Sequence, residues 1–86
     1  MLINLTMSQK LIKRYTSLVG FFESQSEAAR QLNVKQPSVN AWLTGKAKMG
    51  AISAQRAEIV TKGKFKAVDL CPRLAEIEKL KTPSGN

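Results

Sequence analysis

The chain has 86 residues, enough for one small domain and too few for a second hydrophobic core. Its net charge of +8 predicts a polyanionic partner, although basic proteins also bind membrane surfaces. The single cysteine, Cys71, excludes an internal disulfide and fits a cytoplasmic protein. The lack of histidine excludes a zinc-finger ligand set and the commonest general base. We therefore expect no enzymatic activity, metal, cofactor, small-molecule ligand or membrane partner.

The N-terminal part of the chain is expected to contain one long helix. Residues 1–7 show no helical or strand period and are expected to be a flexible terminus, as are residues 82–86, which leaves residues 8–81 as the domain. From Ser8 on, apolar residues at helical spacing predict an amphipathic helix that packs on the core, in which Gly20 predicts a bend or a division. The apolar stripe consists of Leu11, Ile12, Tyr15, Leu18, Val19 and Phe22.

Residues 25–44 have helical periodicity in two parts, with a break at Asn33 and Val34. The first part has an apolar face of Ala28, Ala29 and Leu32, and the second has one of Val39, Trp42 and Leu43. Two short helices joined by a tight turn match the helix-turn-helix, whose second helix enters the DNA major groove. We interpret the other predicted helices as support for this unit.

The ends of both helices have recognisable signals. Ser24 and Glu27 predict a capping box, in which each side chain bonds the backbone N–H of the other, so the first helix starts at Gln25. Helix N-termini favour anions, so Gln25 is either a phosphate contact or only part of the cap. The second helix is expected to start near Gln36, with a proline in its first turn, and to end where Gly45 can adopt the left-handed conformation.

Polar side chains occupy the outward and leading side of the second helix, where base contacts are expected. Gln and Asn pair with adenine, Ser bonds several bases, and Pro or Ala can touch a thymine methyl. A solvated polar face has a similar composition, but the position on the second helix favours base contact, most for Gln36 and Ser38 and least for Asn40. The candidates are Gln36, Pro37, Ser38, Asn40 and Ala41.

The segment after the second helix is basic. Lys46 and Lys48 are expected to hold backbone phosphates, although solvated surface lysines would look the same. Between Ala28 and Ala57 the chain has five Lys or Arg residues and no acid, which concentrates the positive charge around the motif.

The remaining residues predict further helices. Ser53 is expected to cap a helix over residues 54–62, which Gly63 ends; residues 64–66 are expected to be extended and 67–71 to form a helical turn. Pro72 permits a last helix over residues 72–80. Its apolar stripe either completes the core or presents a partner surface, and it consists of Leu74, Ile77 and Leu80.

Residues 25–44 resemble the helix-turn-helix of lambdoid phage Cro and repressor proteins, with Gln25 at the first position, Ala29 at the fifth, Val39 at the fifteenth and Trp42 at the eighteenth. Asn33 stands at the ninth position, where glycine is usual. The flanks, FFESQSEAARQLNVKQPSVNAWLTGK followed by RAEIVTKGKF and VDLCP, are similar to the small Cro-like regulators of phages and prophages, including Cro-like antitoxin-type proteins.

The resemblance implies an all-α, lambda-repressor-like domain of four to five helices and a homodimer, at least on DNA, that binds double-stranded operator DNA. It places the protein in the bacterial cytoplasm, associated with the nucleoid. It assigns base contacts to Gln36, Pro37, Ser38, Asn40 and Ala41. It assigns phosphate contacts to Gln25, Lys35, Thr44, Lys46 and Lys48.

The predicted function is therefore a sequence-specific transcriptional regulator, a Cro-type repressor of a phage or prophage. Two alternatives stay open. One is an antitoxin-like or accessory regulator whose last helix also binds a protein partner. The other is a non-specific architectural DNA binder.

Overall fold

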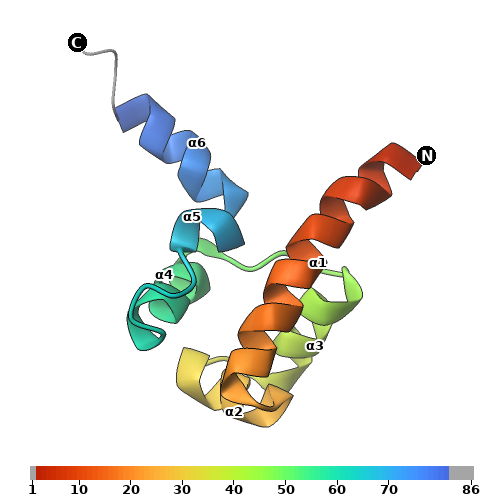
Figure 1. The fold of residues 1–86 in the computed structure, drawn as a ribbon, viewed down its shortest axis with the longest axis vertical. Coiled ribbons are helices and arrows are strands. Elements are labelled where there is room, and N and C mark those ends of the chain that lie inside the picture. Colours follow the sequence, from red (N-terminus) through yellow and green to blue (C-terminus); the bar gives the residue numbers. More distant parts are fainter. Residues whose placement is uncertain (1, 82–86) are drawn as a thin grey trace.

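A computed structural model describes the backbone of residues 2–81 and the side chains of residues 9–80. Within this range the chain is all-helical, as expected, and the short α5 brings the helical segments to six. Figure 1 shows α1 crossing the other helices, while its first part and α6 extend beyond them. The helices are α1 (Leu2–Phe22), α2 (Gln25–Leu32), α3 (Gln36–Thr44), α4 (Ala51–Val60), α5 (Ala67–Leu70) and α6 (Pro72–Lys81).

Helix α1 forms one side of the core. Its buried side chains recur at i, i+4, i+7 and i+11, as the apolar stripe predicted, and they are Leu11, Tyr15, Leu18 and Phe22. The expected start at Ser8 is wrong, because residues 2–7 are helical backbone continuous with the rest of α1. The helix also runs through Gly20 without division. Despite its length, neither α1 nor any other described helix is apolar enough over a sufficient span to cross a membrane.

Helices α2 and α3 pack against each other across a tight turn. Ala28 is fully buried and Ala29 nearly so, which lets the α3 backbone approach closely, and Val39 and Trp42 fill the space on the α3 side. Asn33 ends α2 with φ 58° and ψ 46°, the left-handed conformation that asparagine adopts more readily than most residues. The turn therefore forms without the usual glycine.

Helix α4 differs from the expectation at both of its ends. It begins at Ala51 after Gly50, so Ser53 lies inside the helix and is not its cap, and it ends at Val60. Arg56 of this helix donates to Leu32 O at 3.1 Å, which satisfies a carbonyl in the last turn of α2. This bond and the packing of α4 on α2 stabilise the position of α2 in the helix-turn-helix.

The segment between α4 and α6 is a series of turns and one helical turn. Of residues 64–66, which were expected to be extended, Lys66 is extended, whereas Lys64 and Phe65 form a bend in which the Phe65 N–H donates to the buried Thr61 hydroxyl at 3.2 Å. Helix α5 is the expected helical turn, and Glu58 accepts its first N–H, from Ala67, at 2.8 Å. Leu70 and Cys71 are buried beside α1.

Helix α6 is attached to the domain at its first turn. Leu74 packs against the core, whereas Ile77 and Leu80 are 44% and 79% exposed. The apolar stripe of this helix therefore completes the core at one position only. Its other two large side chains face solvent.

Candidate nucleic-acid interface

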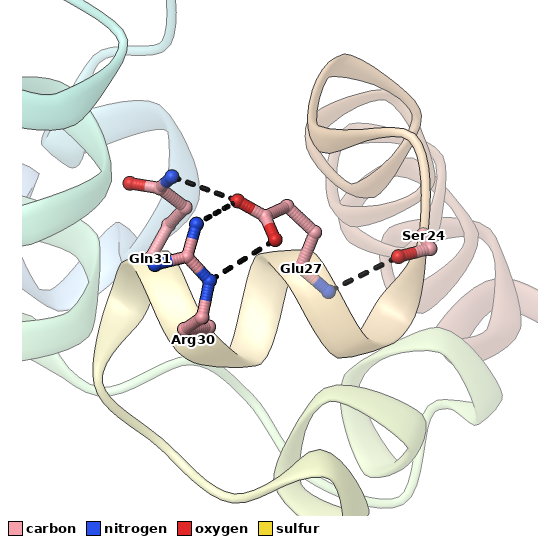
Figure 2. A network of polar contacts seen from close by, with 4 residues as sticks. All are labelled: Ser24, Glu27, Arg30 and Gln31. Carbon is pink, nitrogen blue, oxygen red and sulfur yellow. Dashed lines mark hydrogen bonds and ion pairs between the residues drawn. The ribbon is translucent and has the colours of Figure 1, made fainter.

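The start of α2 is fixed by one half of the predicted capping box. Ser24 accepts the Glu27 N–H at 3.1 Å, but the Glu27 carboxylate does not return to Ser24. Figure 2 shows it turned toward Arg30, with which it forms an ion pair, and Gln31, whose Nε2 donates to it at 2.9 Å. The hydrogen bond from Arg30, followed by that from Gln31, lowers the pKa of Glu27 below its usual value. The reciprocal bond was therefore wrongly predicted, because two nearby donors on α2 compete for the carboxylate.

The ends of α3 are as predicted. Lys35 is the extended residue before the helix, and a proline occupies its first turn. Gly45 follows the helix with φ 79°, and its N–H donates to Trp42 O at 3.4 Å. A Cβ at this glycine would lie 3.0 Å from Ile12 Cδ1, so the end of that side chain would have to shift by a few tenths of an ångström. The left-handed conformation is the stronger reason for glycine at this position.

The candidate base contacts share one side of α3. Gln36, Pro37, Ser38 and Asn40 are exposed, and Ala41 is half-buried at the edge of this side. The opposite side is buried, with Val39 at 0% and Trp42 at 4% exposure. All of the candidates lie in the first two turns of the helix, the part that contacts base edges in a helix-turn-helix. We call this set the reading face.

One side chain outside α3 contacts the reading face, and the sequence did not indicate it. The Ser26 hydroxyl of α2 hydrogen bonds to Gln36 Oε1 at 3.1 Å. The bond holds the Gln36 side chain and brings the start of α2 beside the start of α3. Ten residues separate the two side chains, so only the geometry of the turn could have indicated this contact.

The candidate phosphate contacts lie around α3, with Gln25 and Lys35 near its start and the other three at its end or beyond it. Gln25 is half-buried at the first position of α2, and Lys35 is exposed. Thr44 is exposed, and its hydroxyl bonds Asn40 O at 3.0 Å within α3. Lys46 and Lys48 are exposed in the loop that follows.

No acidic side chain neutralises these lysines within the described part of the chain. Arg30 forms an ion pair with Glu27, whereas Lys35, Lys46 and Lys48 take part in no ion pair among the side chains of residues 9–80. These three exposed lysines have no acidic partner, so their positive charge attracts an approaching polyanion. Dissolved salt is the main factor that weakens this attraction. The reading face therefore lies between uncompensated positive charges.

This fold is that of a helix-turn-helix domain, with α2 and α3 as the two helices of the motif. No family model matches the chain, and no solved structure does. The chain is 47% identical over 58 residues to the protein named "Regulatory protein cro" of Pseudomonas phage D3, an alignment that covers 67% of this chain and 80% of that protein. The chain belongs to the Cro family of phage regulatory proteins, as the resemblance of residues 25–44 and their flanks predicted.

Proposed function

We propose that the protein is a sequence-specific DNA-binding transcriptional regulator, a Cro-type repressor of a phage or prophage. It would bind pseudo-palindromic operator DNA as a homodimer and obstruct polymerase. The observation that carries the proposal is the reading face: a Cro-family chain exposes polar side chains on the first two turns of α3 while the other side of that helix is buried. The proposed site of action is the DNA of the bacterial cytoplasm.

The chemistry of the reading face suits the major groove. Gln36 and Asn40 each offer an amide that can donate to adenine N7 and accept from its N6 amine. Ser38 can donate or accept, and Pro37 and Ala41 can contact the methyl group of thymine. Base pairs differ in the pattern of these groups in the major groove, so such contacts distinguish one sequence from another.

The phosphate contacts would fix the position of α3 without reading sequence. Lys35, Lys46 and Lys48 supply charge, and Gln25 stands where the first N–H groups of α2 favour an anion. Thr44 would have to release Asn40 O before its hydroxyl could donate to a phosphate. It is therefore the weakest of the proposed contacts.

A homodimer would place two reading faces about 34 Å apart, one turn of B-DNA. Helix α6 supports the proposal of a second copy, because Ile77 and Leu80 are exposed apolar side chains that the described part of the chain leaves uncovered. The same observation supports the second candidate function, a regulator that binds another protein through this helix.

Replacing Ile77 and Leu80 together by serine tests the dimer, because it keeps the packed Leu74 in place. We expect sedimentation to show a wild-type dimer, at least on DNA, and a monomer for the variant, which would occupy operator half-sites independently. A variant that stays dimeric would exclude α6 as the dimer interface. Wild type that is monomeric on and off operator DNA would exclude the dimer itself.

The function is tested by selecting DNA that the protein binds from a random pool. The selected sites are then titrated in gel shifts at two salt concentrations with unrelated competitor DNA. We expect a pseudo-palindromic consensus and binding that resists the competitor. Equal competition by unrelated DNA would instead identify an architectural DNA binder.

A further inference from the structure

The loop of residues 45–50 between α3 and α4, here named the clamp loop, is attached near both ends. Near its start the N–H groups of Lys46 and Ala47 donate to Ala41 O at 2.9 and 3.3 Å. Near its end Met49 is buried, and its N–H donates to the Tyr15 hydroxyl at 3.0 Å. Lys46 is exposed at the first attachment, and Lys48 is exposed next to the second. The backbone position of Lys46 therefore depends on the bond to Ala41, and that of Lys48 depends on the bond to Tyr15.

Tyr15 connects the clamp loop to two other parts of the domain. Its hydroxyl accepts from Met49 and donates to Leu70 O at 3.0 Å, at the end of α5. Its side chain is 1% exposed, and its ring lies 6.1 Å from that of Trp42 of α3, centroid to centroid. Burial raises the pKa of the Tyr15 phenol, which keeps the proton that the bond to Leu70 O requires.

The middle of the clamp loop does not pack closely on α1. A hollow of about 30 Å³ lies between the two, lined by residues that include Ile12, Ala47 and Lys48. The close contacts lie at the ends of the loop, where Gly45 approaches Ile12 and where Met49 is buried. The Tyr15 hydroxyl is thus the polar anchor of the end that carries Lys48.

We propose that Tyr15 is a positioning residue for DNA binding, which fixes Met49 and thereby holds the neighbouring Lys48 where it meets the DNA backbone. This inference rests on the proposed function. Tyr15 is buried and would not touch DNA itself. A loop that is ordered on folding does not lose its conformational freedom again on binding, so its lysines bind phosphate at a lower entropic cost.

Tyr15→Phe tests the proposal, with Thr61→Val as its matched control. The buried Thr61 hydroxyl also accepts a backbone N–H, from Phe65 at 3.2 Å, and donates to a backbone carbonyl, Ala57 O, at 2.8 Å. Each substitution removes one such hydroxyl, but Thr61 lies after α4 and contacts no residue of the clamp loop through it. Both variants are compared with wild type on its selected DNA, at a temperature where circular dichroism shows all three folded.

We expect Tyr15→Phe to bind about tenfold more weakly and to reduce the slope of log affinity against log salt by about one unit, since the phosphate contact of Lys48 is lost. Thr61→Val should keep the wild-type slope. A slope in Tyr15→Phe equal to that of the control would overturn the positioning role while leaving the proposed function intact. Wild type without salt-dependent binding to DNA would overturn both.

If Tyr15→Phe does not fold, a measurement on wild type tests whether the Tyr15 hydroxyl holds the Met49 end of the clamp loop. Amide hydrogen exchange of Met49 should be as slow as that of the buried helical core, because the N–H is bonded to Tyr15 inside the protein. Exchange as fast as that of exposed loop amides would mean that the anchor opens readily, and it would overturn the proposal.

Discussion

Helices α3 and α6 are nearly equal in length, at nine and ten residues, but they distribute their apolar side chains in opposite ways. Helix α3 buries Val39 and Trp42 and presents polar side chains to solvent. Helix α6 packs Leu74 and presents Ile77 and Leu80. The packing of α3 is thus completed by its own chain, whereas that of α6 is not. Polar side chains exposed on a well-packed helix are available for recognition, and apolar side chains exposed on a loosely attached helix favour association.

The charged residues around the two helices also differ: those around α3 are basic, whereas those of α6 are of both signs. Lys35 precedes α3, Lys46 and Lys48 follow it, and no acid lies between Ala28 and Ala57. Helix α6 mixes both signs, with two glutamates among its basic residues. A polyanion is therefore attracted to the surroundings of α3 and much less to α6.

The largest expected effect concerns packing. Trp42→Ala should destabilise the domain by about 3–5 kcal/mol, because it removes a buried ring and leaves a cavity. Leu80→Ala should change the stability of the monomer by less than about 0.5 kcal/mol, because its side chain is already in water. Urea denaturation at low protein concentration measures both values. A similar loss in the two variants would refute the contrast between the helices.

The next effect separates the two kinds of contact near α3. Gln36→Ala should cost about 1–3 kcal/mol and relax specificity at one base position, because the amide reads a base edge. Lys48→Ala should weaken binding to all sequences alike and reduce the salt slope by about one. Titration against a panel of single-base operator variants measures the difference. Uniform weakening by Gln36→Ala would make Gln36 a backbone contact.

The helix-turn-helix could be predicted from the sequence because local signals fix its ends. Ser24 caps α2, Asn33 adopts the left-handed conformation of the turn, and Gly45 ends α3. Each of these acts within a few residues of its own position. The buried and the exposed side of α3 could also be predicted, because burial along the helix follows the helical repeat.

The errors and omissions occurred where a particular side-chain contact, which neither periodicity nor capping rules reveal, decides the structure. The bend at Lys64 and Phe65 accompanies a bond from the Phe65 N–H to the Thr61 hydroxyl, where the sequence predicted extended backbone. At Glu27 two competing donors displaced the expected bond. Tyr15 was expected only as a core residue, because no pattern in the sequence indicates that its hydroxyl meets Met49 and Leu70.

The pH dependence of stability tests how firmly the end of the clamp loop is held beside α3. The pKa of Tyr15 is raised by burial above its usual value of 10.0, so the folded chain keeps this proton at pH values where the unfolded chain loses it. The stabilisation is fully present below pH 10 and is lost as the pH rises through the folded pKa. We expect stability to fall more steeply with alkaline pH in wild type than in Tyr15→Phe.

Denaturation at several alkaline pH values measures this difference, and titration of the ultraviolet absorbance of the protein's single tyrosine provides an independent check. Lysines also lose their charge in this range, but they are common to both proteins and cancel in the comparison. Identical alkaline slopes would show that the phenol is not held in the buried, bonded state.

The smallest expected effect concerns the support of the reading face. Ser26→Ala removes the bond to Gln36 Oε1 and should cost about 0.5–1.5 kcal/mol of DNA affinity, the usual net value of one hydrogen bond. The loss should be confined to the base position that Gln36 reads, because Ser26 acts through that side chain. In a double-mutant cycle, Ser26→Ala should then cost nothing further once Gln36 is alanine. Equal costs in both backgrounds would show that Ser26 acts on DNA or on folding by itself, and Gln36 would need no support from α2.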